Sequence, residues 1–382
     1  MKILWLNPWF GNYRLPVYEG LKKLTHDNFY LMAGTQEMDE SLLEKLKVSL
    51  GEHCNINTSY KRLVIGNASS NFANASIGIP VTRGVFRWLK KISPDIVIVD
   101  GFFQWCPIAL LYCIIFSKPL VIDYERTEYV ERNSPKWRTF YRKIIGHFVS
   151  GYIVNGSLTI KYLKKLKLAN VPIQEGCMAA DTVFLRQQTV NYPQNERESL
   201  RAQYQTNNGL VYLFVGQFVE RKGVAQMLEA WEKHVVSYPN DVLLMIGRGV
   251  LVDMINEKAC SSIKVLGGIP YNEIYKYYAI SDVFLMPTLE DNWSLVVPEA
   301  MACGLPILTS IYNGCYPELV KNGENGFVFD PLDKDNFCTA LSKVHNADLE
   351  AMGKNSVKLQ DNYTPEKASE RIYQLCKQLL EK

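Results

Sequence analysis

Residues 282–304 read DVFLMPTLEDNWSLVVPEAMACG, an apolar strand, a polar loop and a helix in immediate succession. The apolar run ends at Pro287, and the helix is expected over about residues 295–303. Short apolar runs that alternate with helical segments are typical of parallel βαβ units. Ligands of such sheets bind where a strand ends and the next helix begins, so this loop is the first candidate site.

The same alternation continues on both sides of this stretch. We expect further strands at residues 2–7, 95–100, 119–125, 151–157, 210–216, 241–247, 264–268, 306–310 and 326–330, and helices near 15–24, 107–116, 224–235 and 272–281. A polar segment near residues 171–195 separates the two series. The pattern therefore predicts an α/β chain of two doubly wound, Rossmann-like domains, residues 1–185 and 186–363.

Composition is consistent with two folded domains. The chain has 382 residues, of which 47% are hydrophobic and 21% charged, which excludes a disordered chain. Its nine cysteines have neither CxxC nor Cys/His spacing, so structural zinc is not expected and a reducing compartment fits best. Residues 1–14 lack the pattern of a signal peptide, and the longest apolar stretch, 106–116, is too short to span a bilayer. We expect a cytoplasmic protein.

Charge is distributed unevenly along the chain. Residues 1–180 carry 23 Lys and Arg against 14 Asp and Glu, a net charge of +9, and the remaining residues, with 19 against 25, carry −6. A basic half suggests nucleic acid or an anionic membrane as a partner, and the sequence contains no nucleic-acid-binding module. Cations alternate with apolar residues at 83–91, 136–143 and 161–167, where Trp88 or Trp137 could sit among lipid headgroups. A solvated helix face is the alternative interpretation.

A second motif, GQFVERKG, spans residues 216–223 between a strand and a helix. The strand ends at Gly216 and leads into Gln217. The adjacent Arg221 and Lys222 offer two cations to a diphosphate. Taken alone, this segment is equally typical of a solvated turn.

The loop of residues 287–304 adds two kinds of candidate. Ser294 is expected to cap the following helix, so that the backbone amides of residues 292–295 (Asn292, Trp293, Ser294, Leu295) form an anion site. Glu299 falls on the apolar side of that helix, where a carboxylate is costly unless it is paired or binds hydroxyls. The two hydroxyls of a ribose would satisfy it, and a structural carboxylate that bonds backbone amides is the alternative.

These motifs, in this order and spacing, resemble the retaining glycosyltransferases of family 4, also called glycosyl transferases group 1. The resemblance is densest over residues 215–330, through FVGQFVERKG, IGRGV, LGGIPYNEIYKYYAISDVFLMP, EDNWSLVVPEAMACGLPILTS and NGCYPELVKNGENGFVF. It implies the GT-B fold, two Rossmann-like domains that face a central cleft. It also implies that the last helix, residues 364–382, crosses back onto the first domain.

The resemblance also implies roles for particular residues. Glu299 would bind the donor ribose, and Asp291, one methylene shorter than the family's usual glutamate, would touch the transferred sugar. The family's arginine and lysine on the donor diphosphate align with Gln217 and Lys222, so the arginine is missing here. Arg221 is expected to take its place, because a guanidinium can hold two phosphate oxygens.

On the acceptor side the resemblance is weaker. The glycine-rich loop of the family corresponds to residues 7–14, where Gly11, Asn12 and Arg14 are the candidates, and a frequent family histidine is absent from the region of Asp123 and Glu125. We assign these five residues to the acceptor side, with an ordinary surface loop as the alternative.

Together these features predict a retaining, metal-independent glycosyltransferase with no cofactor besides its nucleotide diphosphate sugar. Its acceptor would be a glycan or a lipid-linked saccharide, reached from the inner face of a membrane. A catalytically silent nucleotide-sugar-binding protein and an epimerase or phosphorylase of the same fold are the alternatives. A nucleic-acid partner is not expected.

Overall fold

The computed structural model describes residues 1–8, 11–34, 40–57, 61–66, 72–74, 76–206 and 208–381. The chain forms two compact units. Unit 1 comprises Met1–Ala179 together with Pro365–Lys382, and unit 2 comprises Ala180–Thr364. The sequence analysis placed these two breaks at 185/186 and 363/364. Within the described part of the chain, no helix combines the length and the apolar character needed to cross a bilayer.

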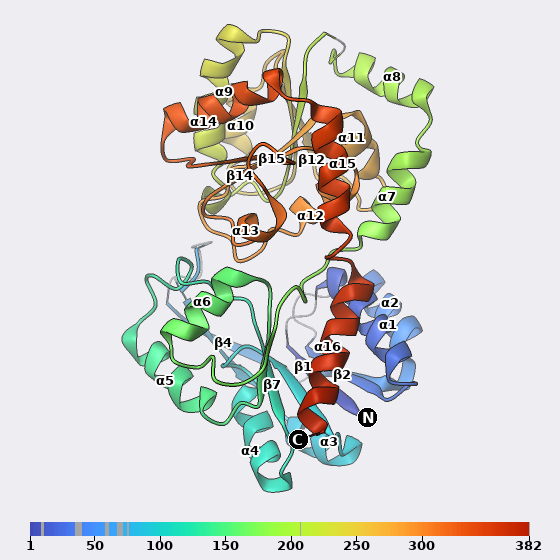
Figure 1. The fold of residues 1–382 in the computed structure, drawn as a ribbon, viewed down its shortest axis with the longest axis vertical. Helices are drawn as coiled ribbons and strands as arrows, with labels where there is room; N and C mark the ends of the chain where they lie inside the picture. The colour runs from blue at the N-terminus through green and yellow to red at the C-terminus, as the bar shows by residue number, and fades with distance from the viewer. Residues whose placement is uncertain are drawn as a thin grey trace. The chain divides into compact units, whose positions relative to one another are not determined.

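Unit 1 contains a seven-stranded parallel sheet in the order β3-β2-β1-β6-β7-β8-β9 (Figure 1). Its strands are β1 (Ile3–Asn7), β2 (Phe29–Gly34), β3 (Cys54–Asn57), β6 (Ile96–Asp100), β7 (Leu120–Tyr124), β8 (Gly151–Val154) and β9 (Ile173–Gln174). A separate antiparallel pair is formed by β4 (Lys61–Gly66) and β5 (Ser76–Val81). Strand order reverses between β1 and β6, so the carboxyl ends of these strands are the place where a doubly wound sheet binds ligands.

Helices cover both faces of this sheet because successive residues of each strand point to opposite sides. In β1, Leu4 and Leu6 enter one core, whereas Ile3 and Trp5 enter the other. The first core lies under α3 (Val85–Ile92), α4 (Cys106–Phe116), α5 (Lys136–Gly146) and α6 (Ser157–Lys165). The second lies under α1 (Leu15–Leu24), α2 (Glu40–Leu50) and α16 (Pro365–Leu380). Short 3-10 turns, η1 (Asn12–Arg14) and η2 (Gly51–His53), complete the unit.

Helix α16 is the part of unit 1 that follows unit 2 in the chain. It packs along α1, where Gly20 has no Cβ and the Ser369 side chain occupies the space that one would fill. Ala368, Ile372, Leu375 and Cys376 are buried in the same core as β1. The last helix is therefore an integral part of this domain.

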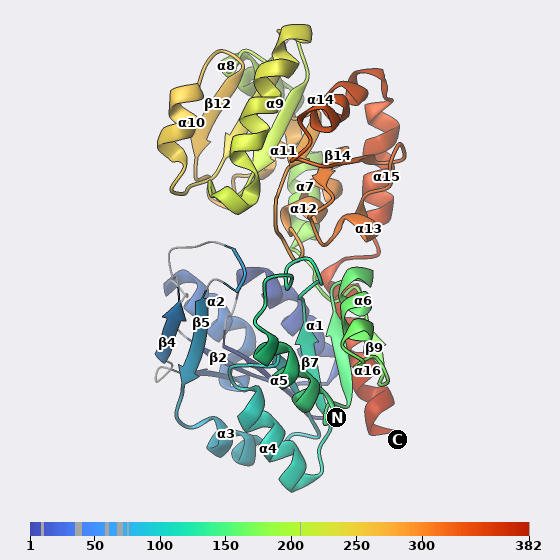
Figure 2. The same cartoon turned by 90° about the vertical axis from the view of Figure 1, so that its left-hand side faces the viewer.

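Unit 2 repeats the architecture with six parallel strands in the order β12-β11-β10-β13-β14-β15 (Figure 2). The strands are β10 (Val211–Val215), β11 (Val242–Ile246), β12 (Ile263–Gly267), β13 (Val283–Met286), β14 (Ile307–Ser310) and β15 (Gly326–Phe329). The helices are α7 (Thr182–Asn191), α8 (Gln194–Gln203), η3 (Glu220–Lys222), α9 (Val224–Ser237), α10 (Val252–Lys258), α11 (Tyr275–Ile280), α12 (Val296–Ala302), α13 (Tyr316–Leu319), α14 (Lys334–Lys343), η4 (Val344–Asn346) and α15 (Leu349–Gln360). The predicted fold class, two doubly wound α/β domains, is confirmed.

Two expectations about the basic segments of unit 1 are wrong. Trp88 packs into the core under α3 and is only 8% exposed, so it cannot sit among lipid headgroups. Arg142 is also buried, because its guanidinium pairs with the buried Glu131 carboxylate at 2.6 Å. Trp137, in contrast, is 49% exposed on α5.

Candidate active site

In unit 2 the turn η3 is held against the loop that follows β13. The backbone oxygen of Arg221 accepts hydrogen bonds from the Leu289 amide (2.8 Å) and the Thr288 hydroxyl (2.9 Å). Gly223 ends the turn at φ 70°, and a Cβ there would collide with the backbone oxygen of Pro287. The glycine therefore allows the close approach that brings the two predicted motifs together.

Asp291 is the centre of the resulting cluster. One oxygen of its carboxylate, Oδ2, accepts from the Lys222 ammonium and from the Ser294 hydroxyl (2.7 Å), and the Arg221 guanidinium lies 3.8 Å away. Burial raises the pKa of Asp291, but Lys222 and Arg221 outweigh it and hold the pKa below its usual range. The carboxylate is thus ionised, and it keeps both cations at the carboxyl ends of β10 and β13.

Gln217 stands next to this cluster, directly after Gly216 at the end of β10. Its side-chain oxygen accepts from Nη2 of Arg221 at 3.2 Å, while Nη1 of Arg221 donates to the backbone oxygen of Glu290 at 3.4 Å. About a quarter of the Arg221 side chain is exposed. Arg221 therefore lies beside Gln217, the position that aligns with the family's arginine.

The loop before α12 differs from the prediction. Helix α12 begins at Val296, and its N-cap residue is Leu295 rather than Ser294. The Ser294 amide donates to the Asn313 side chain (3.3 Å), and the Trp293 amide donates to Asp291 Oδ1 (3.2 Å). The predicted anion site of unoccupied amides is therefore wrong for these two positions, because side-chain oxygens within the domain already satisfy them.

Asn313 is a residue that the sequence analysis missed as part of this site. It is fully buried, and its amide nitrogen donates to the Thr309 hydroxyl at 3.0 Å, which aims its oxygen at Ser294. The next residue, Gly314, donates its amide to the Asp291 backbone oxygen at 2.9 Å, and a Cβ there would strike the backbone oxygen of Asn292. The signal was present in the Asn-Gly pair, which taken alone is typical of an ordinary turn.

Two polar groups of the same loop are buried without a hydrogen-bond partner among the described residues. They are the side-chain oxygen of Asn292 and the indole nitrogen of Trp293. Buried polar groups normally have partners, and an unsatisfied one costs about 1–3 kcal/mol. A polar ligand in this loop would satisfy them.

Glu299 is buried in the first turn of α12, with 8% of the residue exposed. Its Oε2 accepts from the Tyr278 hydroxyl at 3.1 Å, and Tyr278 belongs to α11. Burial raises the pKa of Glu299 to about 7, and the Asp181 carboxylate adds to this effect. Pro298 also lies in the first turn, where its missing N–H is tolerated. Glu299 is thus a buried carboxylate. The groups that shift its pKa are Tyr278 and Asp181, and neither is a cation.

In unit 1 the acceptor-side candidates also come together. Arg14, in η1, pairs with Asp123 at 2.5 Å and with Glu125, and it is only 7% exposed. Its amide donates to the backbone oxygen of Gly11 at 3.1 Å. Asn12 contributes backbone to η1, while its side chain and residues 9 and 10 of the predicted loop lie outside the described part of the structure.

Asp100 is a second residue that the sequence analysis missed. It ends β6, in register with Asp123 of β7, and its Oδ1 accepts from the Trp5 indole at 2.6 Å. Burial raises the pKa of both carboxyls, Arg14 opposes this rise, and Asp123 raises the pKa of Asp100 further. One buried arginine thus faces three carboxylates at the carboxyl edge of the sheet.

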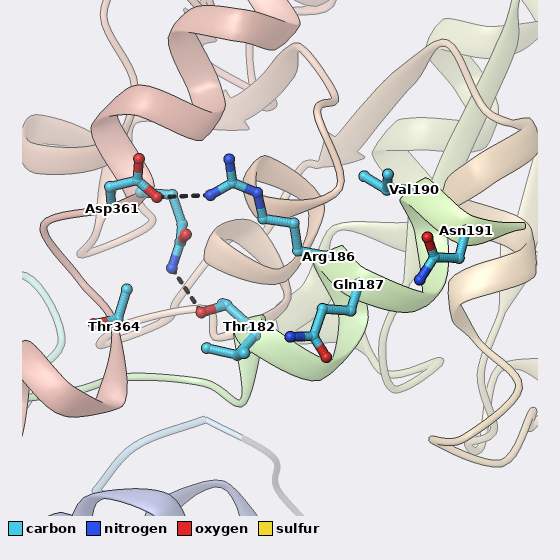
Figure 3. A pocket seen from close by; sticks show the side chains of 9 residues that line it. Thr182, Arg186, Gln187, Val190, Asn191, Asp361 and Thr364 are labelled. Carbon is cyan, nitrogen blue, oxygen red and sulfur yellow. Dashed lines mark hydrogen bonds and ion pairs between the residues drawn. The ribbon is translucent and has the colours of Figure 1, made fainter.

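A pocket of about 430 Å³ lies beside α7 (Figure 3). It is bordered by the ion pair of Arg186 with Asp361 (2.8 Å) and the hydrogen bond from Gln360 to Thr182 (2.8 Å). The residues that line this pocket do not include Lys222, Asp291 or Glu299. The candidate active site is therefore the cluster at the strand ends and not this pocket.

One group of described residues has side chains suited to a metal ion, and it lies elsewhere in unit 2. Asp241 Oδ2 is 2.8 Å from His234 Nε2 and 2.7 Å from His345 Nε2. Asp241 precedes β11, so the group is at the amino end of that strand, whereas the Lys222 cluster is at the carboxyl ends. These residues could not supply a metal to the Lys222 cluster.

Comparison with solved structures identifies the fold. The UDP complex of Anabaena Alr3699/HepE superposes with a TM-score of 0.76 at 15% identity, over 98% of this chain and 99% of that one. A Rickettsia africae glycosyltransferase superposes with a TM-score of 0.74 at 14% identity, over 100% and 98%. The chain therefore has the GT-B fold of paired Rossmann-like domains.

Sequence comparison then identifies the family. Residues 196–359 match the model for glycosyl transferases group 1. Similar proteins include the alpha-monoglucosyldiacylglycerol synthase of Acholeplasma laidlawii (33% identical over 32% of this chain) and the sulfoquinovosyl transferase SQD2 of Arabidopsis thaliana (23% over 82%). A third is the UDP-Gal:alpha-D-GlcNAc-diphosphoundecaprenol alpha-1,3-galactosyltransferase of Escherichia coli (32% over 39%). The matches span 32%, 63% and 40% of these proteins' own lengths.

Proposed function

We propose that the chain is a glycosyltransferase that moves a sugar from a nucleotide diphosphate sugar to a glycan or a lipid-linked saccharide. The observation that carries the proposal is the convergence of Lys222 and Arg221 on Asp291 at the carboxyl ends of two strands. Such a placement suits the stabilisation of a departing diphosphate. The family match and the UDP in the complex of the similar Anabaena protein support the same donor class.

In this proposal Lys222 and Arg221 exchange Asp291 for phosphate oxygens when the donor binds. Lys222 contributes a compact point charge, and Arg221 a planar fork that can hold two oxygens. Two protein cations next to the leaving group would neutralise its developing charge, so we propose that transfer needs no metal ion.

Glu299 would bind the ribose of the donor. A buried carboxylate is stable only when it is paired or hydrogen-bonded, and among the described residues Glu299 accepts from the Tyr278 hydroxyl. Two adjacent ribose hydroxyls would add the missing donors. Asn292 and Trp293, whose polar atoms are buried without partners, would contact the same ligand.

We further propose that the anomeric configuration is retained. The leaving group and the acceptor would then occupy the same face of a sugar with oxocarbenium character, and Asp291 would contact that sugar once Lys222 has turned to the diphosphate. Exclusion of water by the bound substrates would protect the donor from hydrolysis.

The acceptor would meet unit 1 at the cluster around Arg14. Two relatives carry names that contain a lipid, monoglucosyldiacylglycerol and diphosphoundecaprenol. With the basic charge of residues 1–180, this supports a lipid-linked acceptor and a peripheral position on the cytoplasmic face of an anionic membrane.

The experiment is a turnover assay of the full chain against a panel of nucleotide sugars and saccharide acceptors, with and without EDTA. We expect product from one donor, unaffected by EDTA, with an anomeric proton coupling that matches the donor's configuration. Inversion of that configuration would refute retention, and loss of activity in EDTA would refute metal independence. Donor binding without any turnover would favour the silent binding protein, which the departures at Gln217 and Asp291 make the second candidate.

A further inference from the structure

We infer that the outer face of α3, α4, α5 and α6 in unit 1 is the surface that docks onto an anionic lipid bilayer. The inference rests on the proposed membrane-side acceptor and names the part of the molecule that would reach it. These four helices lie together over one face of the sheet (Figures 1 and 2). For brevity we call their solvent side the α3–α6 face.

The four helices of the α3–α6 face carry charges of one sign, although Glu128, in the segment before α5, forms an exposed ion pair with Lys165 of α6. The four helices contain ten Lys or Arg residues and not a single Asp or Glu. Eight of the ten cations are exposed: Arg87, Lys90, Lys91, Lys136, Lys143, Lys161, Lys164 and Lys165. The helices on the opposite face are mixed in charge, since α1, α2 and α16 all carry glutamate. A one-sided positive face suits a negative surface.

The same face exposes large apolar side chains. On α4 they are Leu111, Ile114, Ile115 and Phe116, and on α5 and the turn after it they are Trp137, Phe140, Ile144 and Phe148, each 41–66% exposed. Phe103, just before α4, stacks on Tyr141 of α5 at 4.8 Å and meets Trp137 at 6.0 Å, so the two helices are neighbours. Eight such side chains on two neighbouring helices indicate an interaction surface.

The arrangement on α5 is that of a helix lying in a membrane interface. Trp137, Phe140 and Ile144 follow each other at three and four positions and form one stripe. Lys136 and Lys143 border that stripe. Apolar groups that enter the acyl boundary, flanked by cations at headgroup level, are the pattern of interfacial helices.

Charge also argues against the other occupants. A second copy would have to place this face against itself in a twofold dimer, so that cations would oppose cations. The centre of a protein interface is usually poor in lysine, whereas here lysines border the apolar stripe. A bilayer containing anionic lipid satisfies both the apolar and the cationic groups.

The test is cosedimentation of the full chain with phosphatidylcholine vesicles, with or without phosphatidylglycerol. We expect binding only to the anionic vesicles, and release at high salt. The double variant Ile114→Glu/Phe140→Glu and the double variant Lys136→Ser/Lys143→Ser should each weaken binding about tenfold. The matched controls are Val48→Glu, at an exposed valine of α2, and Lys45→Ser/Lys47→Ser on the same helix, which should bind as the unaltered chain does.

Several results would overturn the inference. They are unchanged vesicle binding by both α4–α5 variants, equal loss in the α2 controls, or equal binding to neutral vesicles. A dimer in light scattering that Ile114→Glu/Phe140→Glu dissociates, without vesicle binding by the unaltered chain, would assign the face to a second copy instead.

A separate readout distinguishes this inference from the proposed function. Donor turnover with a water-soluble acceptor should be the same in the α4–α5 variants and the unaltered chain, because the substitutions lie outside the candidate active site. Vesicle binding without turnover of any nucleotide sugar would refute the proposed function and leave the docking face standing. Turnover without vesicle binding would refute the docking face and leave the proposed function standing.

Discussion

The Lys222 ammonium pairs with the Asp291 carboxylate, although the two residues are 69 positions apart in the sequence. The pair exists because η3 rests on the loop after β13 through the backbone oxygen of Arg221. The carboxylate holds the ammonium at the carboxyl ends of β10 and β13, and in the proposed function the ammonium turns from there to the donor diphosphate. Holding a charge in place before the reaction lowers the reorganisation that the transition state requires.

Lys222→Ala should therefore lower turnover about a hundredfold, or about 3 kcal/mol of transition-state stabilisation, with a smaller change in the donor KM. Steady-state kinetics with the donor identified in the panel would measure this. Lys258→Ala is a suitable control, because Lys258 forms an exposed ion pair with Glu232. Unchanged kcat in a folded Lys222→Ala variant would contradict the donor-site assignment.

Arg221→Ala should be nearly as damaging as Lys222→Ala if Arg221 replaces the missing arginine. Gln217→Arg should be tolerated, because the new guanidinium would lie beside the existing one and both could contact phosphate. The comparison is made by kcat and KM for the same donor. Full activity of Arg221→Ala would mean that Arg221 is a solvated surface charge.

Glu299→Gln should stabilise the unliganded protein at neutral and higher pH. Burial raises the pKa of Glu299 from its ordinary 4.5 to about 7, so the folded state binds the proton more tightly than the unfolded state. The group therefore costs stability progressively as pH rises from about 4.5 to about 7, up to about 3 kcal/mol. Urea unfolding should show equal stability of variant and parent near pH 4 and a more stable variant at pH 8.

The same variant separates binding from stability. Glu299→Gln should also weaken donor binding, because a neutral amide accepts hydrogen bonds from ribose hydroxyls less strongly than a carboxylate. A thermal shift on donor addition that is as large in the variant as in the parent would exclude Glu299 from the ribose site.

Arg14→Met should destabilise unit 1 by about 3–5 kcal/mol, because it leaves buried carboxylates without their cation. The measure is the free energy of unfolding from a urea titration followed by tryptophan fluorescence. The loss should be smaller in Arg14→Met/Asp123→Asn, where one uncompensated charge is also removed. If the double variant is no more stable than the single one, the Arg14–Asp123 pair is not the source of the effect.

The sequence was sufficient for the elements but not for the contacts between them. The strands around Leu213 and Phe284 and the helix containing Glu299 follow from apolar periodicity and from flanking Gly and Pro residues. The burial of Glu299 was predictable for the same reason, because it stands between Val297 and Met301 on a helix whose neighbours are apolar.

The rest depends on contacts between distant residues. Ser294 is an ordinary cap residue by type, but Asp291 takes its hydroxyl and Asn313 its amide. Trp88 and Arg142 lie in segments where cations alternate with apolar residues, yet their side chains point inward, because the helix orientation decides which face is buried. Asp100 enters the site through its register with Asp123, which no local pattern reveals.

The position of α16 has a consequence for synthesis. Ala368 and Ile372 complete the core of unit 1 but are translated only after all of unit 2. Unit 2 is continuous in sequence and can fold as it leaves the ribosome, whereas unit 1 must wait with the surface under α1 uncovered. Unit 1 is thus the first domain to be synthesised and the last to complete its core. Chaperones that bind exposed apolar segments would then act on unit 1.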